Sequence, residues 1–402
     1  MCDCCHSTPQ TCESSRAGAG PSRDERAATP CAWFGHMIQN CLEYATEAKS
    51  HGRPIVCIMC EYTPRELIMA AGGVPVCLCG GTAETIPAAE RELPANLCPL
   101  IKSTFGYDVG RGNPFLEMAD LVVGETTCDG KKKMFELMGR RRPMHVLELP
   151  QKSNDADSFA RWRVELDRFK HRLEEQFHVE ITPDRLREAI CVMNRDRALR
   201  RELAGLMRAD RPPLTGRQLL NLRSSIAGIP DDLAQYEAAL DMLRRRAASG
   251  EGVDGVRVLL TGVPVVHGAE RVVDLIEDAG GLIVASENCS GLKPVVDDVD
   301  PTDDDPMRAL AKKYYRLPCS VMTPNTDRLD LLRELAEAYR PECVVELVWQ
   351  ACLTYDVESN HVKRMVEEEL HLPYLHIETD YSPSDSARIG VRIEALFETV
   401  RA

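Results

Sequence analysis

The sequence predicts an α/β protein with two parallel-sheet domains and a helical insertion between them. Three observations lead to this prediction. Short apolar runs alternate with helical patterns between residues 54 and 150, the strand signal disappears between residues 155 and 246, and the alternation returns after residue 255. Alternating strands and helices are typical of a mostly parallel sheet that helices cover on both faces. A chain of 402 residues is also long enough for about two domains.

The first 34 residues contain several cysteines but no apolar periodicity, so we expect a mobile tail over residues 1–34. Cys2, Cys4, Cys5 and His6 lack the usual spacing of zinc-binding cysteines. The sequence therefore favours a plain tail over a zinc site in this segment.

The first α/β domain is expected at residues 35–154. A helix is predicted over residues 64–71, because Pro64 suits a first helical turn and two glycines follow its end. A second helix is predicted over residues 130–138. Four short apolar runs mark the expected strands, at residues 55–59, 74–79, 119–123 and 144–149.

The middle segment, residues 155–254, is predicted to be helical. Trp162, Leu166 and Phe169 recur at helical spacing, which is typical of an amphipathic helix. Residues 247–255 have the composition of a linker.

The second α/β domain is expected at residues 255–402, and it repeats the pattern of the first. A helix is predicted over residues 269–279, and two glycines again follow its end. We interpret the two halves as copies of one ancestral domain. The expected strands are residues 256–260, 282–285, 343–348 and 374–378.

Charge and hydropathy exclude several classes of function. The net charge of −14 argues against a nucleic-acid partner and against an anionic membrane surface. No apolar run reaches the ~20 residues that a membrane helix needs, and the amino terminus lacks the pattern of a signal peptide. We therefore expect a cytoplasmic protein.

The sequence has 17 cysteines, which is many for a chain without an export signal. Such cysteines are metal ligands, cluster ligands or small buried side chains. Ligands of parallel sheets gather in the loops at the carboxyl ends of the strands. Each half has three cysteines in such loops, which makes six candidate ligands: Cys60, Cys98, Cys128, Cys289, Cys319 and Cys352.

Other cysteines lie inside apolar runs, where a structural role is expected. The sequence leaves Cys31 and Cys79 unassigned. The cysteines with an expected structural role are Cys57, Cys77, Cys191 and Cys343.

The spacing of the six loop cysteines favours an iron–sulfur cluster. Thiolates suit zinc or iron and sulfide, but structural zinc sites take their ligands in close pairs, whereas clusters accept cysteines from distant loops. Three cysteines on a four-iron cubane leave one iron free. That iron can bind a substrate or a sulfide that links it to a second cubane.

A nucleotide site is not expected in this chain. Residues 124–131 resemble a phosphate loop, but they have one residue too many between the glycines. No G-x-G-x-x-G motif follows a predicted strand either.

Five motifs around the cysteines are specific in combination. They are CEYTPREL at residues 60–67, LCP at 97–99, TCDGKK at 127–132, ENCSG at 287–291 and WQAC at 349–352. Together they resemble the 2-hydroxyacyl-CoA dehydratase and benzoyl-CoA reductase superfamily and, within it, the double-cubane cluster proteins. The resemblance covers about residues 35 to 400. It implies two flavodoxin-like or Rossmann-like domains, a homodimer, and a cluster between the domains.

The resemblance also implies a ligand set and a partner. Dehydratase subunits of the family hold one [4Fe-4S] cluster by three cysteines, which correspond to Cys98, Cys128 and Cys352. This chain adds the three further loop cysteines, as the double-cubane branch does, so the resemblance implies an [8Fe-9S] cluster with six thiolate ligands. It further implies that a separate dimeric ATPase with its own [4Fe-4S] cluster supplies the electrons.

We therefore predict an iron–sulfur oxidoreductase that reduces small molecules and depends on ATP through its partner. Two further candidates, Glu61 and Arg65 beside Cys60, either relay protons or form a structural pair, and the structural pair is the preferred interpretation. Leu353 stands where a histidine is expected, so the sequence identifies no proton donor there. The run of lysines at residues 131–133 either offsets cluster charge or forms a docking face.

Two other functions stay open. The alternative enzyme is a [4Fe-4S] 2-hydroxyacyl-CoA dehydratase subunit, or a benzoyl-CoA reductase-like subunit, that acts on a CoA thioester. A different class is a zinc-storing or electron-carrying protein without a catalytic site. The sequence names neither the physiological substrate nor the particular electron donor.

Overall fold

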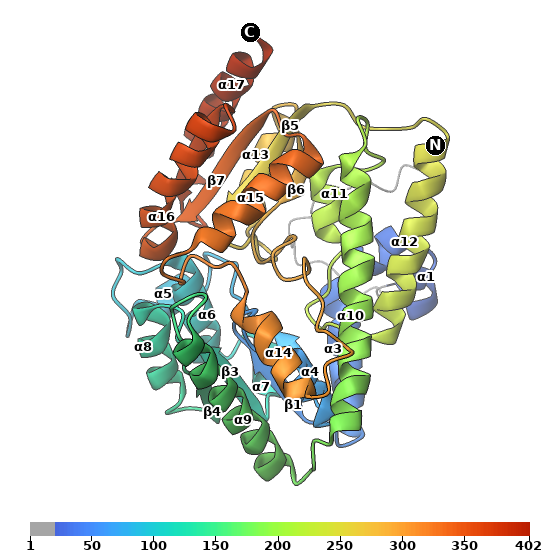
Figure 1. Cartoon of the computed structure of the whole chain (residues 1–402), viewed down its shortest axis with the longest axis vertical. Coiled ribbons are helices and arrows are strands. Elements are labelled where there is room, and N and C mark those ends of the chain that lie inside the picture. Colours follow the sequence, from blue (N-terminus) through green and yellow to red (C-terminus); the bar gives the residue numbers. More distant parts are fainter. Residues whose placement is uncertain (1–20) are drawn as a thin grey trace, which may run out of the picture.

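The computed structural model describes residues 21–402 and has two parallel sheets, as the sequence predicts (Figure 1). Each sheet has four strands, in the order β2-β1-β3-β4 in the first and β6-β5-β7-β8 in the second. All neighbouring strands run parallel. This is the order of the first four strands in a flavodoxin-like sheet. The two halves therefore share one topology, in agreement with their repeated sequence pattern.

The first half holds the first sheet and the helices around it. Its strands are β1 (Ile55–Ile58), β2 (Val74–Cys77), β3 (Leu121–Glu125) and β4 (Met144–Leu147). Its helices are α3 (Met37–Ser50), α4 (Arg65–Ala70), α5 (Ile86–Ala89), α6 (Pro99–Gly110), α7 (Pro114–Glu117) and α8 (Asp129–Met138).

The second half has the same plan. Its strands are β5 (Val256–Gly262), β6 (Gly281–Ser286), β7 (Cys343–Trp349) and β8 (Tyr374–Thr379). Its helices are α13 (Arg271–Asp278), α14 (Pro306–Tyr315), α15 (Thr326–Tyr339), α16 (Leu353–Arg364) and α17 (Ser386–Arg401).

The segment between the halves is helical, as predicted. It contains α9 (Ala156–Phe177), α10 (Pro183–Gly205), α11 (Gly216–Asn221) and α12 (Pro230–Ala248). Within residues 21–402, no helix is long and apolar enough to cross a membrane.

Helices cover both faces of the first sheet, because strand residues point alternately to opposite sides. Val56 and Ile58 of β1 pack in the core under α4, α9 and α10, whereas Ile55 and Cys57 pack in the core under α3, α6 and α8. All four side chains are fully buried. This two-sided burial is typical of a parallel strand, and it explains why β1 reads as a continuous apolar run.

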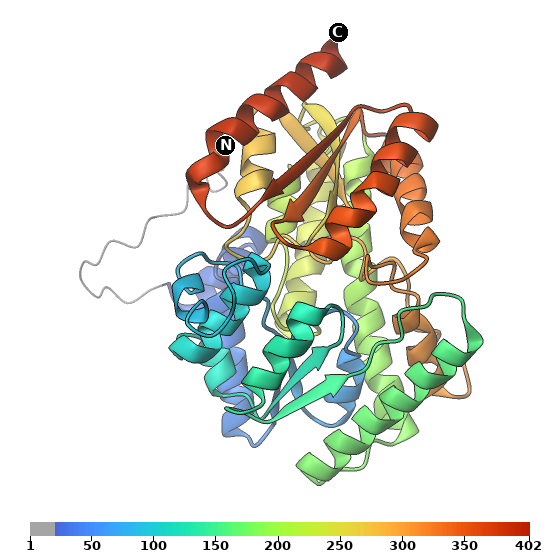
Figure 2. The same cartoon turned by 90° about the vertical axis from the view of Figure 1, so that its left-hand side faces the viewer.

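α10 ties the two halves together. Leu186 and Ile190, in its first turns, belong to the core of the first half. Leu199 and Leu203, nearer its end, belong to the core of the second half. Figures 1 and 2 show this long helix beside both halves. The insertion therefore helps to fix the position of one sheet relative to the other.

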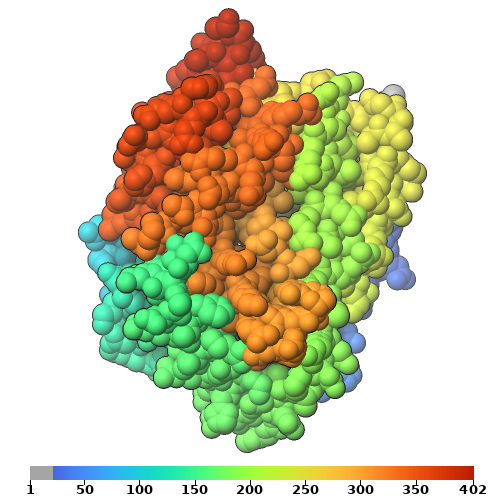
Figure 3. All heavy atoms as spheres, viewed as in Figure 1, coloured from blue at the N-terminus to red at the C-terminus, as the bar shows by residue number. Residues whose placement is uncertain are grey.

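α14 crosses in the opposite direction. It belongs to the second half in sequence, but it packs on α9 and its Leu310 lies in the core of the first half. The space-filling view shows the orange segment around α14 over the junction of the two halves (Figure 3). The loop that follows α14 is therefore held close to the end of β1.

The amino-terminal segment differs from the prediction for its described part. Residues 21–34, expected within the mobile tail, include α1 (Arg23–Ala27) and most of α2 (Pro30–Gly35). Trp33 and Phe34 are buried, and the Phe34 ring stacks on Tyr236 of α12 at 4.7 Å between centroids. A capping box of Ser22 and Glu25 was the available sequence signal. Cys2, Cys4, Cys5 and His6, for which a plain tail was favoured over a zinc site, lie outside the described residues.

We predict that Trp33→Ala destabilises the protein by about 3–5 kcal/mol. The indole is 4% exposed, and its Nε1 donates to Asp232 Oδ1 at 2.7 Å. The substitution removes this contact and leaves a cavity between α2 and α12. Urea unfolding of the full-length protein measures the change.

The control for Trp33→Ala is Val391→Ala, because Val391 of α17 is 66% exposed. Equal unfolding midpoints for the two variants would show that residues 21–34 do not form part of the folded core.

We also predict that His145 makes the protein less stable as the pH falls from about 6.5 toward 4. Burial against α9 and the charge of Arg172 together lower the pKa of the imidazole to about 4. In this pH range the unfolded chain takes up a proton that the folded chain does not, so folding loses free energy. His145→Phe keeps the stacking on Phe169 but cannot titrate. Urea unfolding at pH 7.5 and 5.0 should show a smaller loss for His145→Phe, and an equal loss contradicts the prediction.

Candidate metal centre

The six candidate ligands lie where the carboxyl ends of the two sheets meet. In the first sheet the strand order reverses between β1 and β3, and in the second it reverses between β5 and β7. Loops that leave a parallel sheet at such a point diverge and form a crevice. Cys60 follows β1, Cys128 follows β3 and Cys352 follows β7. The fold therefore directs cysteines from both halves toward one crevice.

Three of the thiols gather as a first group, defined as Cys60, Cys289 and Cys319. Each of the Cys60 and Cys289 thiols interacts electrostatically with Cys319, and they interact with one another. The phenol of Tyr62 faces all three sulfur atoms and donates a hydrogen bond to Leu317 O at 3.0 Å. Cys319 reaches this group because it lies just after α14, which packs on the first half.

The other three thiols form a second group, defined as Cys98, Cys128 and Cys352. They are the residues directly before α6, α8 and α16. The Cys98 and Cys352 thiols interact electrostatically, although they come from different halves, and Cys128 also interacts with Cys98. The phenol of Tyr381 faces the sulfur atoms of Cys98 and Cys352. The structure thus separates the six candidates into two groups of three.

Lys131 lies between the two groups. Its side chain is partly buried, and Nζ donates to Met59 O at 3.1 Å. Burial alone would lower the pKa of this ammonium group, but the neighbouring thiols Cys60, Cys79 and Cys128 keep the pKa above its usual value. One cation therefore faces a member of each group.

The other two lysines of the run point elsewhere. Lys132 pairs with Asp129 at 2.6 Å and Lys133 pairs with Glu136 at 2.7 Å, both on the surface. Of these three lysines, Lys131 is the one that is partly buried among the thiols.

The thiols suit a soft metal by their chemistry and their burial. Burial raises the pKa of Cys60 to about 12, and it raises that of Cys289 as well. Thiols in such a setting stay neutral until a positive partner takes the proton's place, which is what metal binding does. Within residues 21–402, no three His, Cys, Asp or Glu side chains are arranged to hold a single metal ion. A cluster binds one cysteine per iron, so its ligands need not converge on a single point.

A network of buried charges supports the first thiol group from the second half. Lys293 is 1% exposed, pairs with Glu287 at 2.7 Å and donates to the Tyr355 hydroxyl at 3.0 Å. Its charge faces Cys289 and Cys319. Lys293 is therefore the counterpart of Lys131, and nothing in its local sequence pattern indicated this position.

Arg328 of α15 is the centre of the same network. Its side chain is fully buried and contacts Glu287 at 3.3 Å, Glu346 at 3.0 Å and Glu358 at 2.5 Å. Burial alone would raise the pKa of Glu287, but Lys293 and Arg328 lower it to about 2. The carboxylate of Glu287, two residues before Cys289, is thus fixed in its charged form.

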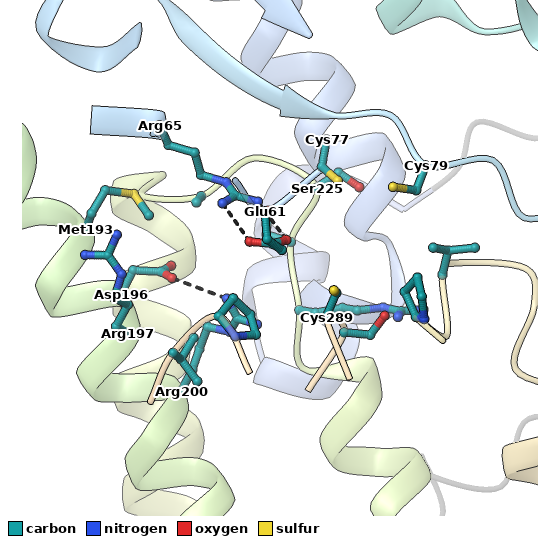
Figure 4. Close-up of a pocket in the computed structure, with 18 of the residues that line it drawn as sticks. Glu61, Arg65, Cys77, Cys79, Met193, Asp196, Arg197, Arg200, Ser225 and Cys289 are labelled. Atoms are coloured by element: carbon teal, nitrogen blue, oxygen red, sulfur yellow. Dashed lines mark hydrogen bonds and ion pairs between the residues drawn. The ribbon is translucent and has the colours of Figure 1, made fainter. Parts of the chain in front are cut away.

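A cavity of about 140 Å³ opens beside the first thiol group (Figure 4). Cys289 lines it, and Glu61 and Arg65 lie in its wall as a bidentate pair at 2.8 and 2.9 Å. Burial alone would raise the pKa of Glu61, but Arg65 lowers it. Glu61 and Arg65 therefore form an ion pair at the edge of the cavity.

The remaining cysteines divide by their surroundings. Cys57 and Cys343 are buried in strands, as expected. Cys77 and Cys79 both line the cavity, so Cys77 is not merely a core residue. Cys191 is exposed on α10. The prediction of a buried Cys191 is wrong, because the apolar residues next to it point inward while its own position faces solvent.

The sequence matches known proteins along most of its length. The sequence model of the family described as 2-hydroxyglutaryl-CoA dehydratase, D-component matches residues 60–400. The chain belongs to this family, which confirms the superfamily that the motifs indicated.

Three relatives illustrate the match. YjiM of Escherichia coli (strain K12), provisionally named a dehydratase subunit, is 41% identical over 91% of this chain and 96% of its own. The (R)-phenyllactyl-CoA dehydratase beta subunit of Clostridium sporogenes is 21% identical over 91% and 97%. The (R)-2-hydroxyglutaryl-CoA dehydratase beta subunit of Acidaminococcus fermentans is 22% identical over 88% and 94%.

We predict that Arg328→Met destabilises the protein by about 3–5 kcal/mol, because it leaves the buried carboxylate of Glu346 without its cationic partner and that of Glu287 with Lys293 alone. Urea unfolding measures the change. Arg333→Met is the control on the same helix, since Arg333 makes an exposed ion pair with Glu369 at 2.8 Å and should cost at most about 1 kcal/mol. Equal effects of the two substitutions contradict this account of the network.

Proposed function

We propose that the protein is an iron–sulfur reductase that binds a double-cubane [8Fe-9S] cluster and reduces small molecules. The observation that carries the proposal is the division of the six loop cysteines into two groups of three. Three thiolates on a four-iron cubane leave one iron without a cysteine. Two neighbouring groups of this kind suit two cubanes that share one bridging sulfide.

In this proposal each thiol group holds one cubane. Cys60, Cys289 and Cys319 would bind the first, and Cys98, Cys128 and Cys352 would bind the second. Lys131 between the groups and Lys293 beside the first would offset the negative charge of thiolates and sulfides. When bound, such a cluster supplies electrons of low potential to a substrate.

The chain's own residues would hold this cluster dry and fixed. Tyr62 and Tyr381 each lie against a thiol group. The phenol of Tyr62, in the first half, donates to Leu317 O in the second half, and the phenol of Tyr381, in the second half, donates to Gly80 O in the first. Hydrogen bonds of this kind hold a ring in place while its face excludes water. Glu61 stays paired with Arg65 in this account, and we assign it no proton transfer.

We further propose that a homodimer of this chain receives its electrons from a dimeric ATPase with its own [4Fe-4S] cluster. Two observations support a separate nucleotide-binding partner. The loop between β3 and α8 lacks the spacing of a phosphate loop. Its Lys131 is directed to Met59 and the thiols instead.

A second candidate function is a [4Fe-4S] dehydratase subunit that acts on a CoA thioester. The names of the Clostridium and Acidaminococcus relatives favour this candidate, since both are CoA-thioester dehydratase subunits. Such a subunit would need only the second thiol group. It leaves the convergence of the first thiol group unexplained, and for this reason we prefer the double cubane.

We predict about eight irons and about nine acid-labile sulfides per chain in protein purified without oxygen. Replacing the first thiol group by Cys60→Ser, Cys289→Ser and Cys319→Ser should reduce the iron to about four per chain or fewer, because three thiolate ligands are lost. Iron analysis and the visible spectrum measure both values. Cys191→Ser is the control, since this cysteine is exposed on α10 and is not one of the six candidate ligands.

Other outcomes overturn the proposal. About four irons per chain before and after removal of the first thiol group would support the dehydratase subunit. A colourless preparation rich in zinc would support a zinc-storing protein.

A further inference from the structure

The wall of the cavity beside Cys289 contains a positive charge that is not directed at the thiol groups. Four arginines line it, and each has a carboxylate partner: Arg65 with Glu61, Arg197 with Glu66, Arg200 with Asp196 and Arg223 with Glu270. These four pairs are neutral overall. The fifth cation of the cavity wall is Lys313 of α14.

Lys313 has no such partner. Its side chain is 6% exposed, and Nζ donates only to the backbone oxygen of Pro294 at 3.0 Å. Within residues 21–402, no carboxylate lies within ion-pair distance of this ammonium group. Burial and the charge of Arg197 lower its pKa to about 8, so it keeps most of its charge at neutral pH. A buried ammonium group without a counter-ion is costly, so the site favours an anion.

Lys313 also differs from the two lysines at the thiols. Lys131 and Lys293 have thiol sulfur atoms among their strongest electrostatic neighbours. The strongest neighbours of Lys313 are Arg197, Glu66 and Glu61 instead. A cluster at the thiols would therefore be balanced by Lys131 and Lys293, and the charge of Lys313 would stay available to the cavity.

Arg200 offers further donors to an anion. Its guanidinium meets Asp196 only at 3.7 Å, and one quarter of the side chain is exposed. Figure 4 shows Arg200 and Asp196 on one side of the cavity and Cys289 on another. Met193 and Val295 add apolar side chains to the wall of the cavity. The cavity thus combines an anion-binding end with an apolar surface.

We infer that this cavity binds a short-chain carboxylate, held by Lys313 and Arg200, as the small-molecule substrate of the proposed reductase. One unbalanced cation matches one negative charge, which favours a carboxylate over a phosphate dianion. The cavity has room for about ten water-sized atoms, so a whole coenzyme A does not fit inside it. The apolar wall suits a short hydrocarbon chain beside Cys289. The role of the ligand as a substrate rests on the proposed function, whereas its negative charge is inferred from Lys313 alone.

The test measures binding rather than activity. Isothermal titration calorimetry on the full-length protein, purified without oxygen, compares sodium crotonate with the neutral isostere crotonamide. We expect crotonate to bind and crotonamide to bind at least tenfold more weakly. Lys313→Met should weaken crotonate at least tenfold, whereas Lys312→Met should leave it unchanged, because Lys312 is exposed and paired with Asp303 at 3.0 Å.

A second readout guards against misfolding of the variant. Without ligand, Lys313→Met should melt at the same temperature as the parent protein or higher, because the substitution removes an uncompensated buried charge. Crotonate should raise the melting temperature of the parent and not that of the variant. A lower melting temperature for the unliganded variant means that Lys313 is a structural residue, and this result overturns the inference.

Three binding results also overturn it. The first is equal binding of crotonate and crotonamide, and the second is tighter binding of inorganic phosphate than of crotonate. The third is that crotonate does not bind, whereas coenzyme A binds and Lys313→Met weakens its binding. The iron analysis is independent of these results. Eight irons without carboxylate binding would contradict only this inference, and carboxylate binding with four irons would contradict only the proposed cluster.

Discussion

The site depends on one geometric constraint, which is that parallel strands end at the same edge of their sheet. Each half places its loops at one edge, and α10 and α14 hold the two edges against each other by packing across the boundary. Cysteines far apart in the sequence, such as Cys60 and Cys319, become neighbours for this reason. A slip in the packing of α14 would move Cys319 while leaving both sheets intact. The ligand set is therefore a property of the interface between the halves rather than of either half alone.

Burying so many polar groups at this interface requires that nearly every charge has a partner. Arg328 meets three carboxylates, and Lys293 meets the carboxylate of Glu287 and the hydroxyl of Tyr355. These contacts join α15, α16, β7 and the loop after β6, so they fix the segment that carries Cys289. The same network keeps positive charge beside the thiols, where a cluster with negative ligands needs it. The stability of the second half and the electrostatics of the site thus rest on the same side chains.

Sequence reasoning located the strands and the loop cysteines because both follow local rules. The apolar run of β1 and the position of Cys128 directly before α8 are visible within a few residues. The role of Lys293 was not visible, since its partners Glu287 and Tyr355 are defined by the fold and its own surroundings look ordinary. Cys191 was placed wrongly because an apolar neighbourhood does not say which way one helical residue points. The helices of residues 21–34 were missed because their burial depends on α12, about 200 residues away.

The two thiol groups are not equivalent in their surroundings. The cavity is lined by Cys289 of the first group and by none of the second. The second group lies instead at the starts of α6, α8 and α16, against Tyr381. The ammonium group of Lys131 interacts electrostatically with a thiol of each group, Cys60 in the first and Cys128 in the second. A ligand in the cavity would therefore lie beside the first group and not beside the second. The two halves repeat one domain in sequence. Because α14 crosses from the second half to the first, the two thiol groups nevertheless have different surroundings.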